Sequence, residues 1–235
     1  MIAYETFLEN LSAVRARIKA ACEKAARPIS DVALLPVTKT HPEQATLYAH
    51  KAGLFTVGEN RVQEAAAKKQ AVPELAGTLR WELVGHLQSN KAKLALETFS
   101  RIQSVDSVAL AQRLNRLWLE RGQTDAFAIL LEVNTGEDPN KFGFQTQQTA
   151  AALEEILSTC PALRVEGLMT VAPLEGGRAV ARTAFAALRE LRESLQAKFK
   201  TPLPELSMGM TDDLEEAILE GSTLIRVGTA LFGTR

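Results

Sequence analysis

Lys39 is the residue whose place in the sequence most favours covalent chemistry. It follows the apolar run at residues 32–37 and Thr38, a pattern typical of a short strand buried on both faces. A lysine at the end of such a strand loses part of its hydration, and desolvation favours the neutral amine that Schiff-base chemistry requires. The alternative, from the strand alone, is a lysine whose flexible stem carries its ammonium group out to solvent.

Two later segments place a hydroxyl and a glycine at the predicted ends of strands. Ser207 and Gly209 end one apolar run, and Gly228 and Thr229 end the last one. Backbone N–H groups at the start of a helix bind phosphate, and glycine lets the phosphate oxygens come close. Each segment alone fits a turn glycine with a helix-capping hydroxyl equally well, but two of them on adjacent strands favour an anion site.

Arg226 lies inside the last apolar run and is expected to be buried. A buried arginine keeps its charge and therefore needs a partner, which is either an interior carboxylate such as Glu132 or a ligand. An amine for an aldehyde, an arginine for a ring nitrogen and a phosphate cradle together describe a pyridoxal phosphate site. Other barrels that form Schiff bases also hold a phosphate, so these residues alone leave the cofactor open.

Strand and helix patterns alternate along the chain and place these residues at strand ends. About eight apolar runs each precede a helical pattern, which predicts right-handed βαβ units and a parallel sheet. This number of units fits a single α/β domain over residues 1–235, a closed (β/α)8 TIM barrel, better than an open doubly wound sheet. Residues 1–27 are expected to form an extra helix outside the barrel. The predicted strands are residues 32–39, 55–59, 81–85, 101–106, 127–133, 165–170, 205–209 and 224–228.

The composition argues against several classes of protein. A formal net charge of -1 gives no electrostatic case for nucleic acid or a membrane surface, and no apolar run approaches the length of a membrane span. The N-terminus carries acidic residues and no basic region, unlike a signal peptide, so a cytoplasmic protein is expected. Cys22 and Cys160 are expected to be free buried thiols, and the histidines lack the spacing of a metal site.

Distinctive motifs are spread over nearly the whole chain, at residues 35–40, 58–64, 81–91, 167–170, 206–210 and 225–233. The most specific is Gly-His-Leu-Gln-Ser-Asn-Lys, which ends at Lys91. Together these motifs resemble those of the pyridoxal phosphate homeostasis protein family. Glu82 is a departure, because the family is expected to carry histidine there, and we expect it to alter local surface contacts more than cofactor binding.

The resemblance implies a fold-type III barrel, of the alanine racemase type, that binds pyridoxal 5'-phosphate as a Schiff base on Lys39. By position, Arg226 would face the pyridine nitrogen. Asn60 and Met169 would lie beside the ring, although Asn60 fits a helix N-cap and Met169 a core position equally well. The implied phosphate-binding residues are Ser207, Gly209, Gly228 and Thr229.

The resemblance also implies a carrier or reservoir for the cofactor in intracellular vitamin B6 homeostasis, and not an enzyme. A cation beside the ring nitrogen disfavours its protonation and leaves the ring a poorer electron sink. The chain ends at Arg235, so we expect no room for the second domain of related racemases. A monomer is expected, with pyridoxal phosphate and apo-forms of its dependent enzymes as partners. Two alternatives are a pyridoxal phosphate-dependent amino-acid racemase or related enzyme, and a Schiff-base lyase acting on a sugar phosphate.

Overall fold

Strands and helices alternate in the computed structural model, which describes residues 1–138, 141–173 and 175–234. Each predicted strand is present within these residues, with bounds that differ from the predicted ones by at most three residues. A two-residue strand that the sequence did not predict, β6 (Phe144–Gln145), pairs with β5 alone. The other strands are β1 (Ala33–Pro36), β2 (Thr56–Glu59), β3 (Arg80–Leu83), β4 (Arg101–Val105), β5 (Phe127–Asn134), β7 (Leu163–Met169), β8 (Glu205–Ser207) and β9 (Leu224–Val227).

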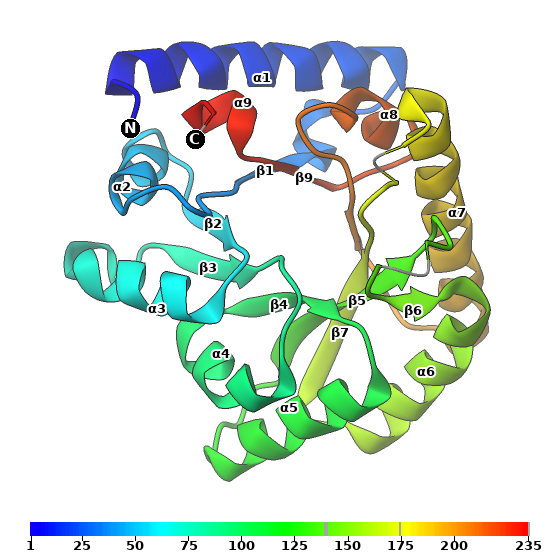
Figure 1. Ribbon diagram of the computed structural model, residues 1–235. Coiled ribbons are helices and arrows are strands. Elements are labelled where there is room, and N and C mark those ends of the chain that lie inside the picture. Colours follow the sequence, from blue (N-terminus) through cyan, green and yellow to red (C-terminus); the bar gives the residue numbers. More distant parts are fainter. Residues whose placement is uncertain (139–140, 174, 235) are drawn as a thin grey trace.

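The main strands close into a barrel. Within the described residues they pair in parallel, in the order β1-β9-β8-β7-β5-β4-β3-β2. A bridge between Val37 and Gly58 joins β1 to β2, and the Thr38 N–H donates to the Gly58 carbonyl at 3.0 Å. Figure 1 shows the strands around the centre with helices outside them. The predicted TIM barrel is therefore confirmed, and the open sheet is wrong.

Helices surround the barrel in chain order, and each from α3 to α7 packs against the next. Their N-termini follow the carboxyl ends of the strands, so that the loops which carry the candidate residues gather at one end. Short 3-10 turns lie at Ile29–Asp31, Pro73–Leu75 and Ser89–Lys91. The helices are α1 (Tyr4–Lys24), α2 (Gln44–Lys51), α3 (Val62–Ala71), α4 (Ala92–Thr98), α5 (Val108–Glu120), α6 (Thr146–Thr159), α7 (Gly177–Phe199), α8 (Leu214–Leu219) and α9 (Thr229–Phe232).

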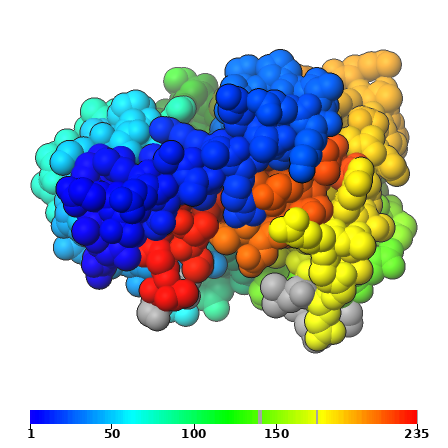
Figure 2. Space-filling view, turned by 90° about the horizontal axis from the view of Figure 1, so that it is seen from above, coloured from blue at the N-terminus to red at the C-terminus, as the bar shows by residue number. Residues whose placement is uncertain are grey.

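Helix α1 lies outside the ring, as predicted, across α8 and α9. Its buried face includes Phe7, which is fully buried and stacks on Phe232 with ring centroids 5.3 Å apart. Asn10 adds a hydrogen bond from its side-chain amide to the Leu231 carbonyl at 3.1 Å. Figure 2 shows this dark blue helix lying against the red C-terminal segment. The first and last segments of the chain therefore stabilise one another.

The remaining expectations from composition concern thiols, metals and membranes. Cys22 and Cys160 are free and buried, as predicted. No group of three or more His, Cys, Asp or Glu side chains in the described part of the chain is placed to hold a metal ion. Among the described helices, none combines the length and apolar character that crossing a bilayer requires.

Candidate functional site

A cavity of about 340 Å³ opens at the carboxyl ends of the strands. Its wall is built from the loops after β1, β2, β3, β7, β8 and β9, which is the end of a (β/α)8 barrel where active sites lie. The predicted site residues that line it are Lys39, Asn60, Arg226, Gly228 and Thr229. Residues far apart in the sequence thus converge on one space of a size suited to a small ligand.

Lys39 lies in the loop after β1, and the buried side chain of Lys68 binds the backbone of this loop. The Lys68 Nζ, on α3, donates to the Thr38 carbonyl at 2.7 Å and to Glu59 Oε1 at 2.6 Å. The Thr38 hydroxyl donates to the same Glu59 oxygen at 2.6 Å. Burial raises the pKa of the Glu59 carboxyl, against the charge of Lys68 and the hydrogen bonds from Lys68 and Thr38. The backbone immediately before Lys39 is therefore anchored to a buried ion pair.

The backbone after Lys39 is held by the same lysine through a second carboxylate. Glu64 accepts the Thr40 N–H and also pairs with the Lys68 Nζ at 2.9 Å. Thr40 has a φ of +61°, a conformation that non-glycine residues adopt only when their surroundings hold them there. The sequence analysis missed this clamp. The i,i+4 spacing of Glu64 and Lys68 was the pattern in the sequence that could have indicated it.

Arg226 lies on the cavity wall although only 4% of its surface is exposed. Its guanidinium donates to Ser207 Oγ at 2.7 Å and to the Thr170 carbonyl at 2.8 Å. No ion pair within 4.0 Å joins it to Glu132 in the described residues, so the interior ion pair considered from the sequence is not formed. Burial lowers the Arg226 pKa to about 10, and the charges of Asp213 and Glu132 oppose that shift. Arg226 therefore stays cationic at neutral pH, with a neutral hydroxyl and a carbonyl as partners.

Glu132 is a half-buried residue near this site, with its Oε2 atom shielded from solvent. Its Oε2 has no hydrogen-bond partner among the described residues. Burial and the charge of Asp106 raise the Glu132 pKa to about 7, and the charge of Arg226 offsets part of that rise. The carboxyl therefore titrates near neutral pH, where ordinary glutamates are fully ionised.

Two loops on the wall offer backbone and hydroxyl donors. Thr229 is the first residue of α9, so its N–H has no partner within that helix. Thr211, in the loop after β8, likewise has a backbone N–H for which the described residues provide no acceptor. A Cβ at Gly228 would lie 3.1 Å from the Val37 carbonyl, which explains a glycine at this close approach. The sequence analysis missed Thr211 and its neighbour Met210, although both directly follow the predicted Gly209.

Three predicted residues lie behind the wall and not on it. Ser207 and Met169 are fully buried, in β8 and β7, and they face each other in the register of those strands. Gly209 has a φ of +95°, and a Cβ there would lie 2.5 Å from the Cβ of Ala217. Its carbonyl accepts the Arg226 N–H at 3.0 Å. Ser207 and Gly209 are therefore linked to the cavity through their hydrogen bonds with Arg226.

Asn60 lines the cavity and does not cap a helix. The N-cap position of α3 is Arg61, and no side chain caps that helix. A Cβ on Gly85 would overlap the Asn60 carbonyl oxygen, so the glycine of the Gly-His-Leu-Gln motif lets the loop after β3 pack against Asn60. This contact explains one residue of the most specific motif.

The family is decided by comparison with known proteins. The model of the alanine racemase N-terminal domain matches residues 10–235. The pyridoxal phosphate homeostasis protein of Pseudomonas aeruginosa is 41% identical over 230 residues, which cover 98% of this chain and 96% of that protein. This chain belongs to the pyridoxal phosphate homeostasis protein family. The family resemblance seen in the sequence is confirmed, and the family is named for homeostasis and not for an enzymatic reaction.

Solved structures agree with this membership. PipY from Synechococcus elongatus has been solved with pyridoxal phosphate bound. It superposes with a TM-score of 0.84 at 39% identity, covering 97% of this chain and 100% of that one. PipY without the cofactor gives a TM-score of 0.85 at 41% identity, with 96% and 99% coverage. The barrel of this family member is thus an established fold of its family.

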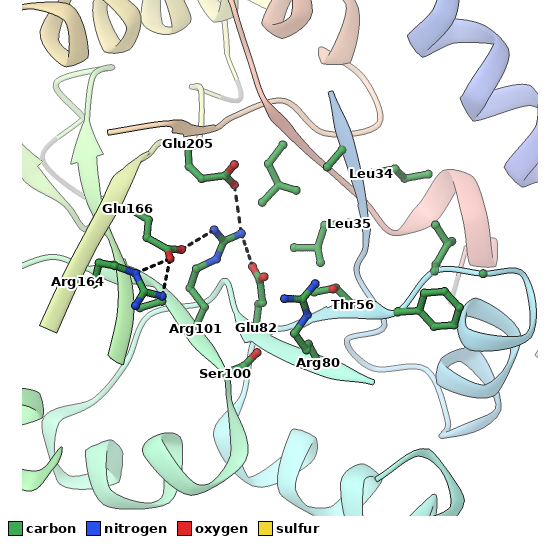
Figure 3. Close-up of a pocket in the computed structure, with 16 residues that line it drawn as sticks. Leu34, Leu35, Thr56, Arg80, Glu82, Ser100, Arg101, Arg164, Glu166 and Glu205 are labelled. Carbon is green, nitrogen blue, oxygen red and sulfur yellow. Dashed lines mark hydrogen bonds and ion pairs between the residues drawn. The ribbon is translucent and has the colours of Figure 1, made fainter. Parts of the chain in front are cut away.

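The opposite end of the barrel holds a second cavity, of about 520 Å³, at the amino ends of the strands. Figure 3 shows Arg101 at its centre, in contact with three carboxylates. Burial would lower the Arg101 pKa, but the charges of Glu82 and Glu205 outweigh it and raise that pKa. In (β/α)8 barrels, residues at this end generally serve stability more than binding. The carboxylates are Glu82 at 3.0 Å, Glu166 at 3.1 Å and Glu205 at 3.2 Å.

Glu82 is the position where the family is expected to carry histidine, and its setting corrects an expectation. Only 7% of its surface is exposed, so it does not make the surface contacts that the sequence analysis assigned to it. Its Oε2 accepts hydrogen bonds from Arg101 and from Gln103 in the barrel interior. Glu82 therefore acts inside the barrel.

Proposed function

We propose that this protein binds pyridoxal 5'-phosphate covalently on Lys39 and serves as a cytoplasmic carrier or reservoir of the cofactor in vitamin B6 homeostasis. The observation that carries the proposal is the convergence of Lys39 and Arg226 on one cavity with the loops at Thr211 and Gly228. The support from relatives is a shared family name and a PipY structure with the cofactor bound.

The residues present fit the cofactor on three grounds. Lys39 is the one lysine on the wall among the described residues, and its loop is fixed on both sides by Lys68. Among the described residues, the N–H groups of Thr211 and Thr229 have no acceptor, which leaves them available to an anion. Arg226 is a buried cation with no carboxylate within 4.0 Å in the described chain.

Each residue then has a defined task. The cofactor supplies an aldehyde for reversible attachment to an amine and a ring that can accept electrons. Lys39 provides the amine, and Arg226 keeps a positive charge on the side of the ring nitrogen, which disfavours a second positive charge there. The loops at Thr211 and at Gly228–Thr229 bind the phosphate. We assign Asn60 to the ring, which Met169 would support from behind the cavity wall. Ser207 and Gly209 support Arg226 and the phosphate loop.

Absorption spectroscopy and mass spectrometry test the binding proposal. The protein incubated with pyridoxal phosphate should gain a visible absorption band, and borohydride should fix the cofactor on the peptide that contains Lys39. Lys39→Ala should lose the fixed adduct, whereas Lys93→Ala, at an exposed lysine of α4, should keep it. An adduct spread over several lysines, or a wild-type protein without the band, would refute the proposal.

Cofactor transfer separates a carrier from an enzyme. A carrier should reconstitute an apo-enzyme from the loaded protein while protecting the aldehyde from added amines better than free cofactor does. A racemase would instead exchange the α-hydrogen of an amino acid for deuterium in a reaction lost in Lys39→Ala. Sedimentation of the same samples tests the proposed monomer. Rapid α-hydrogen exchange without faster or cleaner transfer would favour the enzyme.

A further inference from the structure

A chain of side-chain hydrogen bonds crosses the barrel interior and ends at Arg226. Gln103, on β4, donates from its amide to Glu82 Oε2 at 2.5 Å. Ser207, on β8, donates from its hydroxyl to Gln103 Oε1 at 2.6 Å, and the Arg226 Nη1 donates to Ser207 Oγ at 2.7 Å. β4 and β8 are not neighbours in the sheet, so the bond between Gln103 and Ser207 spans the lumen.

The direction of each hydrogen bond in this chain is fixed by its two ends. An ionised carboxylate accepts only and a guanidinium donates only. Glu82 therefore requires the NH₂ group of Gln103, which turns the Gln103 oxygen towards Ser207. Because that oxygen accepts the hydrogen bond from the Ser207 hydroxyl, the lone pairs of the Ser207 oxygen remain available to Arg226. Each member thus has one orientation that satisfies its neighbours.

Burial makes this orientation costly to lose. Gln103 and Ser207 are fully buried, and Glu82 and Arg226 are 7% and 4% exposed. A polar group that loses its partner in such a place finds no water to replace it. Arg226 has one other partner, the Thr170 carbonyl, so the Ser207 hydroxyl is one of two contacts that set the plane of its guanidinium.

We propose that Gln103 is a positioning residue for the cofactor site and that Glu82 sets its orientation. Gln103 acts through Ser207, by presenting the hydroxyl oxygen to Arg226, and it touches neither the cavity nor the cofactor. The inference rests on the proposed function, since the task of Arg226 is the binding of the cofactor ring. Glu82 fixes the direction of the network because a carboxylate only accepts hydrogen bonds, whereas a side chain that both donates and accepts would allow either direction.

Titration of the wild type and of Gln103→Leu with pyridoxal phosphate tests the proposal. The variant should bind the cofactor about tenfold more weakly, because the Ser207 hydroxyl is no longer held by Gln103 and its charge-assisted hydrogen bond with Arg226 is weakened. The pH midpoint of the visible band of the loaded protein should also rise, because a less fixed cation near the ring disfavours protonation less. Gln147→Leu, at an exposed glutamine, is the matched control and should change neither quantity.

Two further variants separate positioning from a general loss of structure. Ser207→Ala should resemble Gln103→Leu, and the double variant should be little worse than either single one, because both act on the same chain. Gln103→Glu should bind poorly, since it places two carboxylates together. Adding Glu82→Gln exchanges the amide and the carboxylate. It restores the hydrogen bonds from position 82 through position 103 to Ser207, although an amide NH₂ cannot accept the Arg101 donor as Glu82 Oε2 does, and it should recover part of the affinity.

The outcomes distinguish this inference from the proposed function. A wild-type protein that fails to bind pyridoxal phosphate overturns the function and with it the inference. A wild type that binds, together with a folded Gln103→Leu that has unchanged affinity and pH midpoint, overturns the inference alone. If Gln103→Leu does not fold, the exchange pair decides: no recovery in the double variant relative to Gln103→Glu is evidence against a directional chain.

Discussion

At the scale of single residues, the clamp beneath Lys39 depends on one buried charge. Lys68→Met removes the only cation within 4.0 Å of Glu59 in the described chain and leaves that carboxylate uncompensated. We expect a loss of about 3 kcal/mol in the free energy of unfolding, the order found when one partner of a buried ion pair is removed. Urea denaturation measures it. Lys19→Met, at a lysine with 69% of its side chain exposed, should change stability little.

The same clamp offers a test by removal of both partners. Lys68→Met combined with Glu59→Leu eliminates the buried charges together, and replacement of a pair by apolar groups is often close to neutral. The double variant should therefore be more stable than Lys68→Met alone. A double variant that is less stable would show that packing, and not charge compensation, explains the role of Lys68.

Glu132 gives the protein a pH-dependent stability whose sign follows from its raised pKa. The folded-state pKa is about 7 and the ordinary value is 4.5, so the folded state holds a proton that the unfolded state releases. Below pH 4.5 the carboxyl is neutral in both states and does not destabilise the folded state. The free energy of unfolding then falls as the pH rises from 4.5 to about 7. Glu132→Gln should therefore match the wild type at the acidic end and be more stable by about 3 kcal/mol near pH 8.

Unfolding curves at several pH values measure this difference. The control is Glu190→Gln, because that glutamate has 70% of its side chain exposed and should give the same small difference at each pH. A stability difference between Glu132→Gln and the wild type that does not change with pH would mean that folding does not shift the pKa of Glu132.

At the scale of elements, helix α1 reaches the candidate phosphate loop. Arg17 donates to the Thr211 carbonyl at 2.8 Å and pairs with Glu215 at 2.7 Å. Arg17→Gln should loosen the loop and lower the affinity for pyridoxal phosphate about fivefold, the effect of losing roughly 1 kcal/mol of hydrogen bonding. Cofactor titration measures it. Glu215→Gln is the matched control, because it weakens the ion pair and leaves the bond to Thr211 in place.

The elements also show how far the sequence alone could lead. Continuous apolar runs predicted the barrel strands, because strands buried on both faces carry no polar alternation. Position after a strand placed Lys39 and Gly228 on the cavity wall. The sequence did not predict that the Ser207 side chain faces the barrel interior. A shift of one residue in strand register moves a side chain to the other face, and the register is known only from the structure. The Lys68 clamp depends on a contact between a helix and a distant loop, which spacing alone does not determine.

At the scale of the whole molecule, the two ends of the barrel have different chemistry. The amino end is filled by Arg101 and its carboxylates, which satisfy one another (Figure 3). At the carboxyl end, Arg226 and the backbone donors of Thr211 and Thr229 lack anionic partners among the described residues. The seam between β1 and β2, joined by the bridge at Val37, also lies at this end. A ligand there would therefore complete both the electrostatics and the closure of the barrel.

Hydrogen exchange provides the whole-molecule test of that conclusion. The amide of Thr38 donates across the seam to Gly58, and the amide of His41 donates back to the Thr38 carbonyl. Binding of pyridoxal phosphate should slow exchange at these two amides most strongly. At a free cofactor concentration roughly 100 times the dissociation constant, binding should raise the free energy of unfolding by about 2.7 kcal/mol. Hydrogen exchange at the β5 amides of Ile129 and Leu131 should slow only by the amount that this global stabilisation produces. In Lys39→Ala the extra protection of the seam should disappear. If the cofactor stabilised the protein globally without slowing Thr38 and His41, it would be bound away from the seam.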